Sequence, residues 1–224
     1  MLLAEDLLLL LTDDDTGRNA VDTERLDLAL GGAVLLELLE RGAVGVTGPG
    51  DSAKPGRVVV RNPTATGSSV LDGALAILTA RQGDRPKSVV PKLAKGLRAR
   101  LLADLVAAGM LRAEQGRVLG IFPVGRWPAV ERAHEAGVRQ GLHEVLVAGR
   151  TPTAREVELV GLLSAVDAVP AVLRGVSLPK GELRARAKAL AQGNIAGEAV
   201  RQALAEVQAA VMAVIIATTV AAGS

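Results

Sequence analysis

Residues 91–109 are Pro-Lys-Leu-Ala-Lys-Gly-Leu-Arg-Ala-Arg-Leu-Leu-Ala-Asp-Leu-Val-Ala-Ala-Gly, and their pattern indicates the main type of structure in this chain. Apolar side chains recur at every fourth position, at Leu93, Leu97, Leu101 and Leu105. Positions i and i+4 share one face of an α-helix, and proline is well placed in a first turn, so the pattern predicts a helix from Pro91 to Ala108. On another face, basic residues recur at every third position, at Lys92, Lys95 and Arg98. The stretch therefore predicts a helix with a core side and a cationic side.

The aromatic residues are confined to the segment that follows. Phe122 and Trp127 are the only aromatics in 224 residues, and both lie in Gly-Arg-Val-Leu-Gly-Ile-Phe-Pro-Val-Gly-Arg-Trp-Pro, residues 116–128. Glycine and proline at these positions predict a β-hairpin, and large rings on a hairpin favour contact with a membrane interface or a partner groove. The expected membrane-contacting residues are Val118, Leu119, Ile121, Phe122 and Trp127. The alternative is that the rings pack the hairpin onto its own helices.

Helical patterns cover most of the remaining chain. Apolar spacing and breaks at Gly, Pro and Asp predict helices at residues 6–11, 26–41, 70–81, 131–146, 154–169, 180–191 and 195–222. Residues 43–46 and 56–60 predict a second hairpin. We therefore expect a mainly α fold, a single compact helical domain over residues 1–224 with two β-hairpins, of which the later one is protruding and apolar.

Composition and charge limit the class of protein. A hydrophobic content of 49% with 22% charged residues excludes a disordered chain, and the absence of cysteine fits a reducing compartment. Glu5 and Asp6 occupy the place where a signal peptide carries positive charge, and the uncharged run 209–217 is too short to span a bilayer. Residues 81–126 carry 10 basic and 3 acidic side chains, whereas residues 1–80 carry 6 and 12. We expect a cytoplasmic protein, peripheral on the inner face of the cell membrane.

The sequence holds no recognisable catalytic or metal-binding constellation. His134 and His143 fall on opposite sides of their predicted helix, so they cannot share a metal ion. Residues 13–24 carry acids at calcium-loop spacing, but Arg18 stands where that loop needs glycine. The glycine-rich residues 48–54 lack the helix that a phosphate loop would open. We therefore expect no enzyme activity, no metal and no cofactor.

Several short motifs, taken in order, resemble one family. They are Leu-Leu-Glu-Leu-Leu-Glu-Arg-Gly at 35–42, Val-Val-Val at 58–60 with Pro-Thr-Ala-Thr-Gly at 63–67, Gly-Leu-Arg-Ala-Arg-Leu at 96–101, Leu-Val-Ala-Ala-Gly-Met-Leu at 105–111 and Gly-Glu-Ala-Val-Arg at 197–201. In this order the chain resembles the Golgi phosphoprotein 3 family along essentially its whole length, in an alanine-rich bacterial version of the actinobacterial kind.

The resemblance implies a helical domain that binds phosphatidylinositol 4-phosphate on membranes, aided by an apolar hairpin. Two basic residues of the family's phosphate pocket correspond to Lys95 and Arg98, and Lys92 extends this expected headgroup site. The family's Trp and Arg from the first loop and helix correspond to Asp22 and Gly31, so both are replaced here. Because charge-assisted bonds to the phosphate are lost, we expect weaker phosphoinositide specificity.

Three functions fit these observations. The first is a peripheral membrane adaptor that binds an anionic phospholipid surface, with a protein cargo or a second copy of the chain as further partner, because basic residues combined with an apolar hairpin form a two-signal anchor. The second is a soluble protein-interaction scaffold. The third is a winged-helix-like nucleic-acid-binding regulator, since a basic helix followed by two strands fits that motif. The acidic residues 1–80 would repel phosphate, so no nucleic acid is expected.

Overall fold

A computed structural model describes residues 1–13, 15–48, 50–51, 53–118, 122–193 and 198–222. Within these residues the chain forms ten α-helices and two antiparallel two-stranded hairpins, so the expected mainly α fold with two hairpins is confirmed. The helices are α1 (Leu3–Leu10), α2 (Thr23–Glu40), α3 (Ser69–Thr79), α4 (Pro86–Ala94), α5 (Leu97–Ala107), α6 (Ala133–Leu146), α7 (Ala154–Ala165), α8 (Val169–Val172), α9 (Lys180–Gln192) and α10 (Glu198–Ala222). The strands are β1 (Val44–Val46), β2 (Val58–Val60), β3 (Glu114–Val118) and β4 (Phe122–Arg126).

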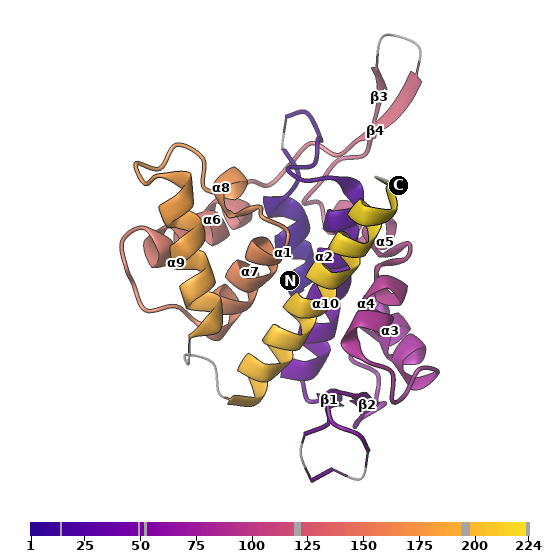
Figure 1. The fold of residues 1–224 in the computed structure, drawn as a ribbon. Helices are drawn as coiled ribbons and strands as arrows, with labels where there is room; N and C mark the ends of the chain where they lie inside the picture. The colour runs from indigo at the N-terminus through magenta and orange to yellow at the C-terminus, as the bar shows by residue number, and fades with distance from the viewer. Residues whose placement is uncertain (14, 49, 52, 119–121, 194–197, 223–224) are drawn as a thin grey trace.

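The helix α2 is the centre of the fold. It packs against α1, α4, α7 and α10, and between Leu26 and Leu38 only Asp27 is partly exposed. Figure 1 shows α10 crossing the front of the molecule, with α4 on one side and α7 and α9 on the other. The core is almost wholly aliphatic, as expected for a chain with two aromatic residues.

Two adjacent glycines let other helices approach α2 closely. A Cβ atom on Gly31 would lie 2.7 Å from the carbonyl oxygen of Val90 in α4, and one on Gly32 would lie 2.9 Å from Cγ1 of Val207 in α10. Both distances are too short for a real Cβ atom. The Gly31–Gly32 pair therefore places α4 and α10 against neighbouring sides of α2 at one level along its axis.

The single helix predicted from Pro91 to Ala108 is wrong. Two helices occupy this stretch, because Lys95 has an extended backbone (ψ 113°) and Gly96 adopts a left-handed conformation (φ 70°). Glycine reaches this conformation without steric cost, which permits a sharp break. Pro91 lies inside α4, and Pro86 occupies the first turn in its place. The leucine pattern holds across the break, because all four of its members are buried.

The two hairpins lie at opposite ends of the molecule in Figure 1. In the first, Val44 pairs with Val60 and Val46 with Val58. The β3–β4 hairpin extends away from the helices (Figure 1), and its pairing runs from Glu114 with Arg126 to Val118 with Phe122. The structure thus supports a protruding hairpin, while its apolar character remains a prediction.

The later helices begin and end close to the predicted residues, with one exception. The helix predicted over residues 154–169 ends at Ala165, and Asp167 takes a left-handed conformation (φ 57°) that turns the chain into the short α8. The capping box at the start of α7 is complete, because Thr153 and Glu156 bond each other's backbone N–H groups.

Candidate functional site

The three expected headgroup residues lie around the break between α4 and α5. Lys92 is in the last turn of α4, Lys95 is the residue that ends this helix, and Arg98 is in the first turn of α5. The prediction that they share one face of one helix is therefore wrong, because the chain turns at Gly96. Lys92 and Lys95 are exposed, and neither side chain has a hydrogen bond or ion pair to any residue that the structure describes.

Arg98 differs from the two lysines because it has a protein partner. Its Nε lies 3.1 Å from Oδ1 of Asp27 in α2, and each of the two side chains is 33% exposed. Burial raises the pKa of Asp27, and the positive charge of Arg98 opposes this rise. Arg98 thus ties α5 to α2 and compensates a partly buried carboxylate. It contributes less free charge to the surface than Lys92 or Lys95.

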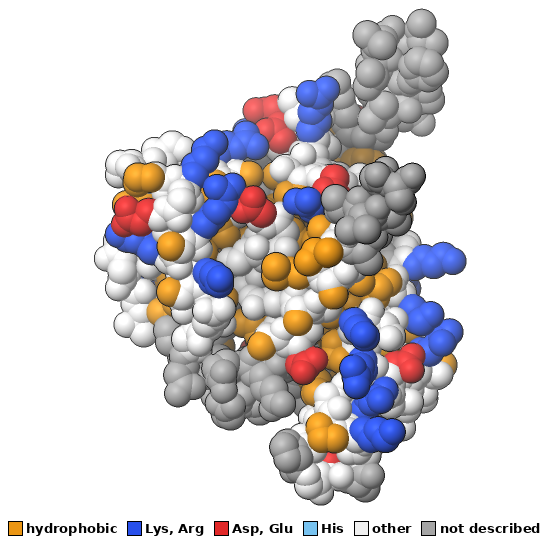
Figure 2. Space-filling model, viewed as in Figure 1, with side chains coloured by type: hydrophobic (Ala, Val, Ile, Leu, Met, Phe, Trp, Pro, Cys, Tyr) orange, Lys and Arg blue, Asp and Glu red, His pale blue; other side chains and the backbone are white. Residues whose placement is uncertain are grey.

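Other basic side chains extend this surface. We call Arg85, Lys87, Lys92 and Lys95 the α4 basic surface, because all four are exposed on α4 or directly at its ends. Figure 2 shows Lys and Arg side chains gathered in a column on the side where α3 and α4 lie in Figure 1. Each basic group near an anionic surface contributes on the order of 1 kcal/mol to binding.

The structure shows what Asp22 and Gly31 do, the two positions that the sequence resemblance assigns to the family's Trp and Arg. Asp22 caps α2, because its Oδ1 accepts a hydrogen bond of 2.9 Å from the backbone N–H of Arg25. Gly31 faces the backbone of α4, where a Cβ atom would already lie 2.7 Å from the Val90 oxygen and 3.0 Å from the Ala94 nitrogen. An arginine at position 31 would therefore require α4 to move.

The five expected hairpin residues are described to different extents. Leu119 and Ile121 lie outside the described residues, and for Val118 and Phe122 only the backbone pairing is described. Trp127 follows β4 directly. Its side chain is partly buried and packs against the core of the molecule. The sequence alternative in which the ring holds the hairpin to the helices thus has direct support at Trp127, while membrane contact stays a prediction.

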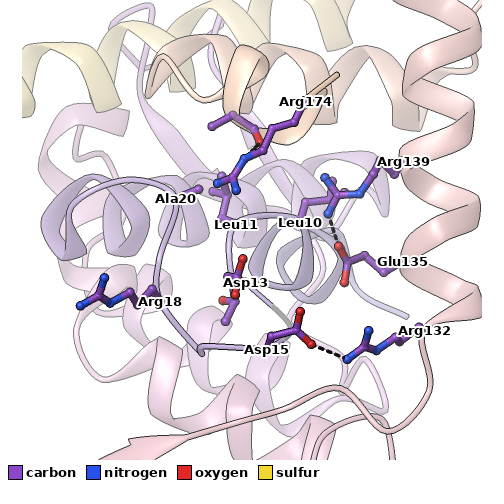
Figure 3. Close-up of a pocket in the computed structure, with 12 residues that line it drawn as sticks. Leu10, Leu11, Asp13, Asp15, Arg18, Ala20, Arg132, Glu135, Arg139 and Arg174 are labelled. Carbon is purple, nitrogen blue, oxygen red and sulfur yellow. Dashed lines mark hydrogen bonds and ion pairs between the residues drawn. The ribbon is translucent and has the colours of Figure 1, made fainter. Parts of the chain in front are cut away.

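A polar pocket that sequence reasoning missed lies where the turn after α1 meets α6 and α8 (Figure 3). It has a volume of about 240 Å³. Opposite charges are paired in it, since Arg132 lies 2.9 Å from Asp15 and Arg139 donates a hydrogen bond to Glu135 one turn earlier on α6. Arg139 also donates a hydrogen bond to the backbone oxygen of Val172. The Arg132–Asp15 pair joins the turn after α1 to the start of α6, and Arg139 joins α6 to α8, which favours a structural role.

Buried carboxylates form a second unexpected cluster. Asp6 is 3% exposed and lies 2.7 Å from Nε2 of His134, and its other oxygen accepts two hydrogen bonds from Arg155. Arg155 also lies 3.8 Å from Glu37. Glu158, 1% exposed, has a pKa raised to about 7 by burial and by the charges of Glu40 and Glu37. The sequence contained a signal for these buried carboxylates, because each acidic residue lies within a run of apolar residues.

No chemistry of a metal centre emerges from these groups. Within the described part of the chain, no three His, Asp or Glu side chains come together in a way that could hold a metal ion. Nor does any described helix combine the length and apolarity that crossing a bilayer would require.

A comparison with protein families gives a match over most of the chain. The model of the family described as Golgi phosphoprotein 3 (GPP34) matches residues 3–207. No curated protein sequence matches the chain. The family match covers nearly all the described helices and includes both the α4 basic surface and the β3–β4 hairpin.

Proposed function

Because the chain belongs to the Golgi phosphoprotein 3 family, we propose that it is a peripheral membrane adaptor whose α4 basic surface binds anionic phospholipid headgroups. Membership in this family suggests an adaptor or lipid-binding role. The observation that carries the proposal is that Lys92 and Lys95 are exposed, adjacent in space to the α4–α5 break and without a protein partner among the described residues. Unpaired ammonium groups are available to phosphate oxygens without first breaking an ion pair.

The proposed binding is reversible and weakly selective. Four basic groups at roughly 1 kcal/mol each give an attachment that salt weakens. Discrimination between headgroups needs hydrogen-bond donors in fixed positions. The two positions at which the family resemblance implies such donors are held here by the helix cap Asp22 and the tightly packed Gly31, and neither side chain can donate to a phosphate. We therefore propose that surface charge matters more than the identity of the anionic lipid.

The β3–β4 hairpin supplies the apolar part of the proposed anchor, through Val118, Leu119, Ile121, Phe122 and Trp127. Its support is the apolar sequence of the loop and the extension of the hairpin away from the helices. A charge signal combined with an apolar insertion is the usual minimum for stable attachment to a bilayer surface. In this proposal the protein is attached to the cytoplasmic face of the cell membrane and presents a protein cargo there.

Charge reversal at the two free lysines tests this proposal. We expect the double variant Lys92→Glu/Lys95→Glu to bind vesicles at least tenfold more weakly, measured by co-sedimentation at low salt. The vesicles are phosphatidylcholine with about 30% phosphatidylserine as the anionic lipid. Arg98 is left unchanged, because a glutamate there would face Asp27 and destabilise the fold.

The matched control is Lys54→Glu/Lys180→Glu. It changes the net charge of the chain by the same amount, at two exposed lysines outside the α4 basic surface. We expect this control to keep most of the affinity. Equal losses in both variants would mean that only the overall charge matters, and unchanged binding by Lys92→Glu/Lys95→Glu would overturn the proposed site.

A further inference from the structure

The helix α10 leaves an apolar stripe exposed. Leu204, Val207, Ala210 and Val211 are buried against the core, whereas Met212 is 49% and Ile216 is 60% exposed, one helical turn apart. The exposed residues Ala205, Ala209 and Ala213 continue the same stripe along the helix. The other large apolar side chains that are exposed in the described residues, Met1 and Val130, stand far from each other in the sequence.

Basic residues of α4 border the stripe on one side. The helices α4 and α10 are in contact, and the Gly31–Gly32 pair holds Val90 and Ala94 of α4 and Val207 and Val211 of α10 at one level of α2. Lys92 and Lys95 lie two residues before and one residue after Ala94, and the exposed Ala209 and Ala213 lie two residues after Val207 and Val211. The free lysines and the apolar stripe therefore lie on two adjacent helices.

The other side of the stripe is also basic. A cavity of about 260 Å³ between α7, α9 and α10 is lined by Met212 together with Arg184 and Lys188 of α9. Arg184 is paired with Asp167 at 2.6 Å, whereas Lys188 is exposed and has no interaction with the described residues. Figure 2 shows hydrophobic side chains along α10 with Lys and Arg side chains on both its sides.

We propose that this face of α10 lies against the anionic bilayer, so that Met212 and Ile216 enter the boundary between headgroups and acyl chains. Lys92 and Lys95 on one side and Lys188 on the other then contact anionic headgroups. The inference rests on the proposed function and adds to it a second apolar element, together with the orientation of the helical body on the membrane. An apolar stripe between two basic borders is the pattern of an interfacial helix.

Charge favours a lipid surface over a second copy of the chain. Two copies that met through this stripe would bring the basic borders of one against those of the other, because both borders carry the same sign. An anionic surface compensates all of these charges at once. The small exposed alanines of the stripe allow the helix to approach the headgroup layer closely.

The first test places a probe on the stripe. The chain contains no cysteine, so the single variants Met212→Cys and Ile216→Cys can each be labelled with a polarity-sensitive fluorophore without background. The matched control is Ala136→Cys, at an exposed position of α6. When vesicles with about 30% phosphatidylserine are added, we expect the emission of a fluorophore at position 212 or 216 to shift to the blue. The emission of a fluorophore at position 136 should stay unchanged.

The second test removes the apolar character of the stripe. We expect Met212→Glu/Ile216→Glu to bind the same vesicles at least tenfold more weakly, with the same thermal unfolding temperature, since both side chains are exposed.

If the natural protein does not bind these vesicles, the proposed function and this inference both fail. Should it bind through Lys92 and Lys95 while the α10 variant binds equally well and the probes do not respond, only the inference is overturned. Light scattering that shows a dimer broken by Met212→Glu/Ile216→Glu, with vesicle binding intact, would assign the stripe to a contact between copies instead.

Discussion

Glu158 is the residue at which the fold bears the clearest electrostatic cost. Its side chain is 1% exposed, its Oε2 has no hydrogen-bond partner among the described residues, and its pKa is raised to about 7, chiefly by burial and then by the nearby charges of Glu40 and Glu37. Arg155 lowers the pKa, but less than the other causes raise it. At neutral pH this carboxyl group is therefore close to its titration midpoint inside the core.

Replacing Glu158 by glutamine tests this cost. A carboxyl group with a raised pKa stabilises the folded state fully below its unfolded pKa of 4.5, and this stabilisation is lost as the pH rises through about 7. We expect Glu158→Gln to exceed the natural protein in free energy of unfolding at pH 8, by on the order of 1 to 3 kcal/mol, with the difference shrinking toward pH 5. Urea denaturation across this range measures it. The exposed Glu24→Gln serves as the control, and two parallel pH curves for Glu158→Gln and the natural protein would refute the account.

The contact between α2 and α4 depends on the absence of a side chain at Gly31. A Cβ atom on Gly31 would meet the carbonyl oxygen of Val90 at 2.7 Å, and this neighbour is backbone that cannot swing aside. Gly137 in α6 is also helical, but a Cβ atom there would meet nothing within 4 Å. Substitutions at these two positions therefore distinguish the effect of packing on stability from the effect of helix propensity.

We expect alanine to have opposite effects at these two glycines. Gly31→Ala should lower the free energy of unfolding by about 1 to 3 kcal/mol, because α4 must shift. Gly137→Ala should raise it by about 0.5 to 1 kcal/mol, because alanine is the better helix former. Denaturant titration of both variants decides the point. A stable Gly31→Ala would mean that α4 is not packed tightly on α2.

The same elements show how far the sequence could be interpreted alone. Amphipathic spacing predicted most helices, because periodicity reports directly on which side of an element is buried, and short apolar runs broken by glycine and proline predicted both hairpins. The break at Gly96 was missed, since the leucine spacing continues across it and only the backbone angles of Lys95 and Gly96 interrupt the helix. Local spacing singled out Lys92 and Lys95, which are exposed as expected. The pairing of Arg98 with Asp27 joins residues far apart in the chain, which no local pattern can predict.

The basic and apolar features that we assign to membrane binding are distributed over several elements. The α4 basic surface, the stripe of α10 and the β3–β4 hairpin come from different parts of the chain. The stripe and the basic surface lie on adjacent helices, because α4 and α10 both pack on α2 and contact each other. The hairpin extends away from this helical body (Figure 1), so its contribution to membrane binding can be changed separately.

The hairpin is therefore expected to tolerate a charge in its loop region without loss of stability. We expect Phe122→Asp to weaken binding to anionic vesicles by about 5- to 150-fold, corresponding to roughly 1 to 3 kcal/mol for one apolar side chain, while the thermal unfolding temperature stays unchanged. Trp127 is the only tryptophan and lies at the foot of the hairpin, partly buried against the core. Its emission should shift to the blue when vesicles are added, because the exposed part of the ring then leaves water.

The control variant is Val130→Asp, at an exposed apolar position outside the hairpin, and it should change neither vesicle binding nor the unfolding temperature. The contrary result is a Trp127 emission that does not shift when vesicles are added, together with a lower unfolding temperature for Phe122→Asp. It would show that the aromatic residues hold the hairpin to the helices. The apolar element of the anchor would then be α10.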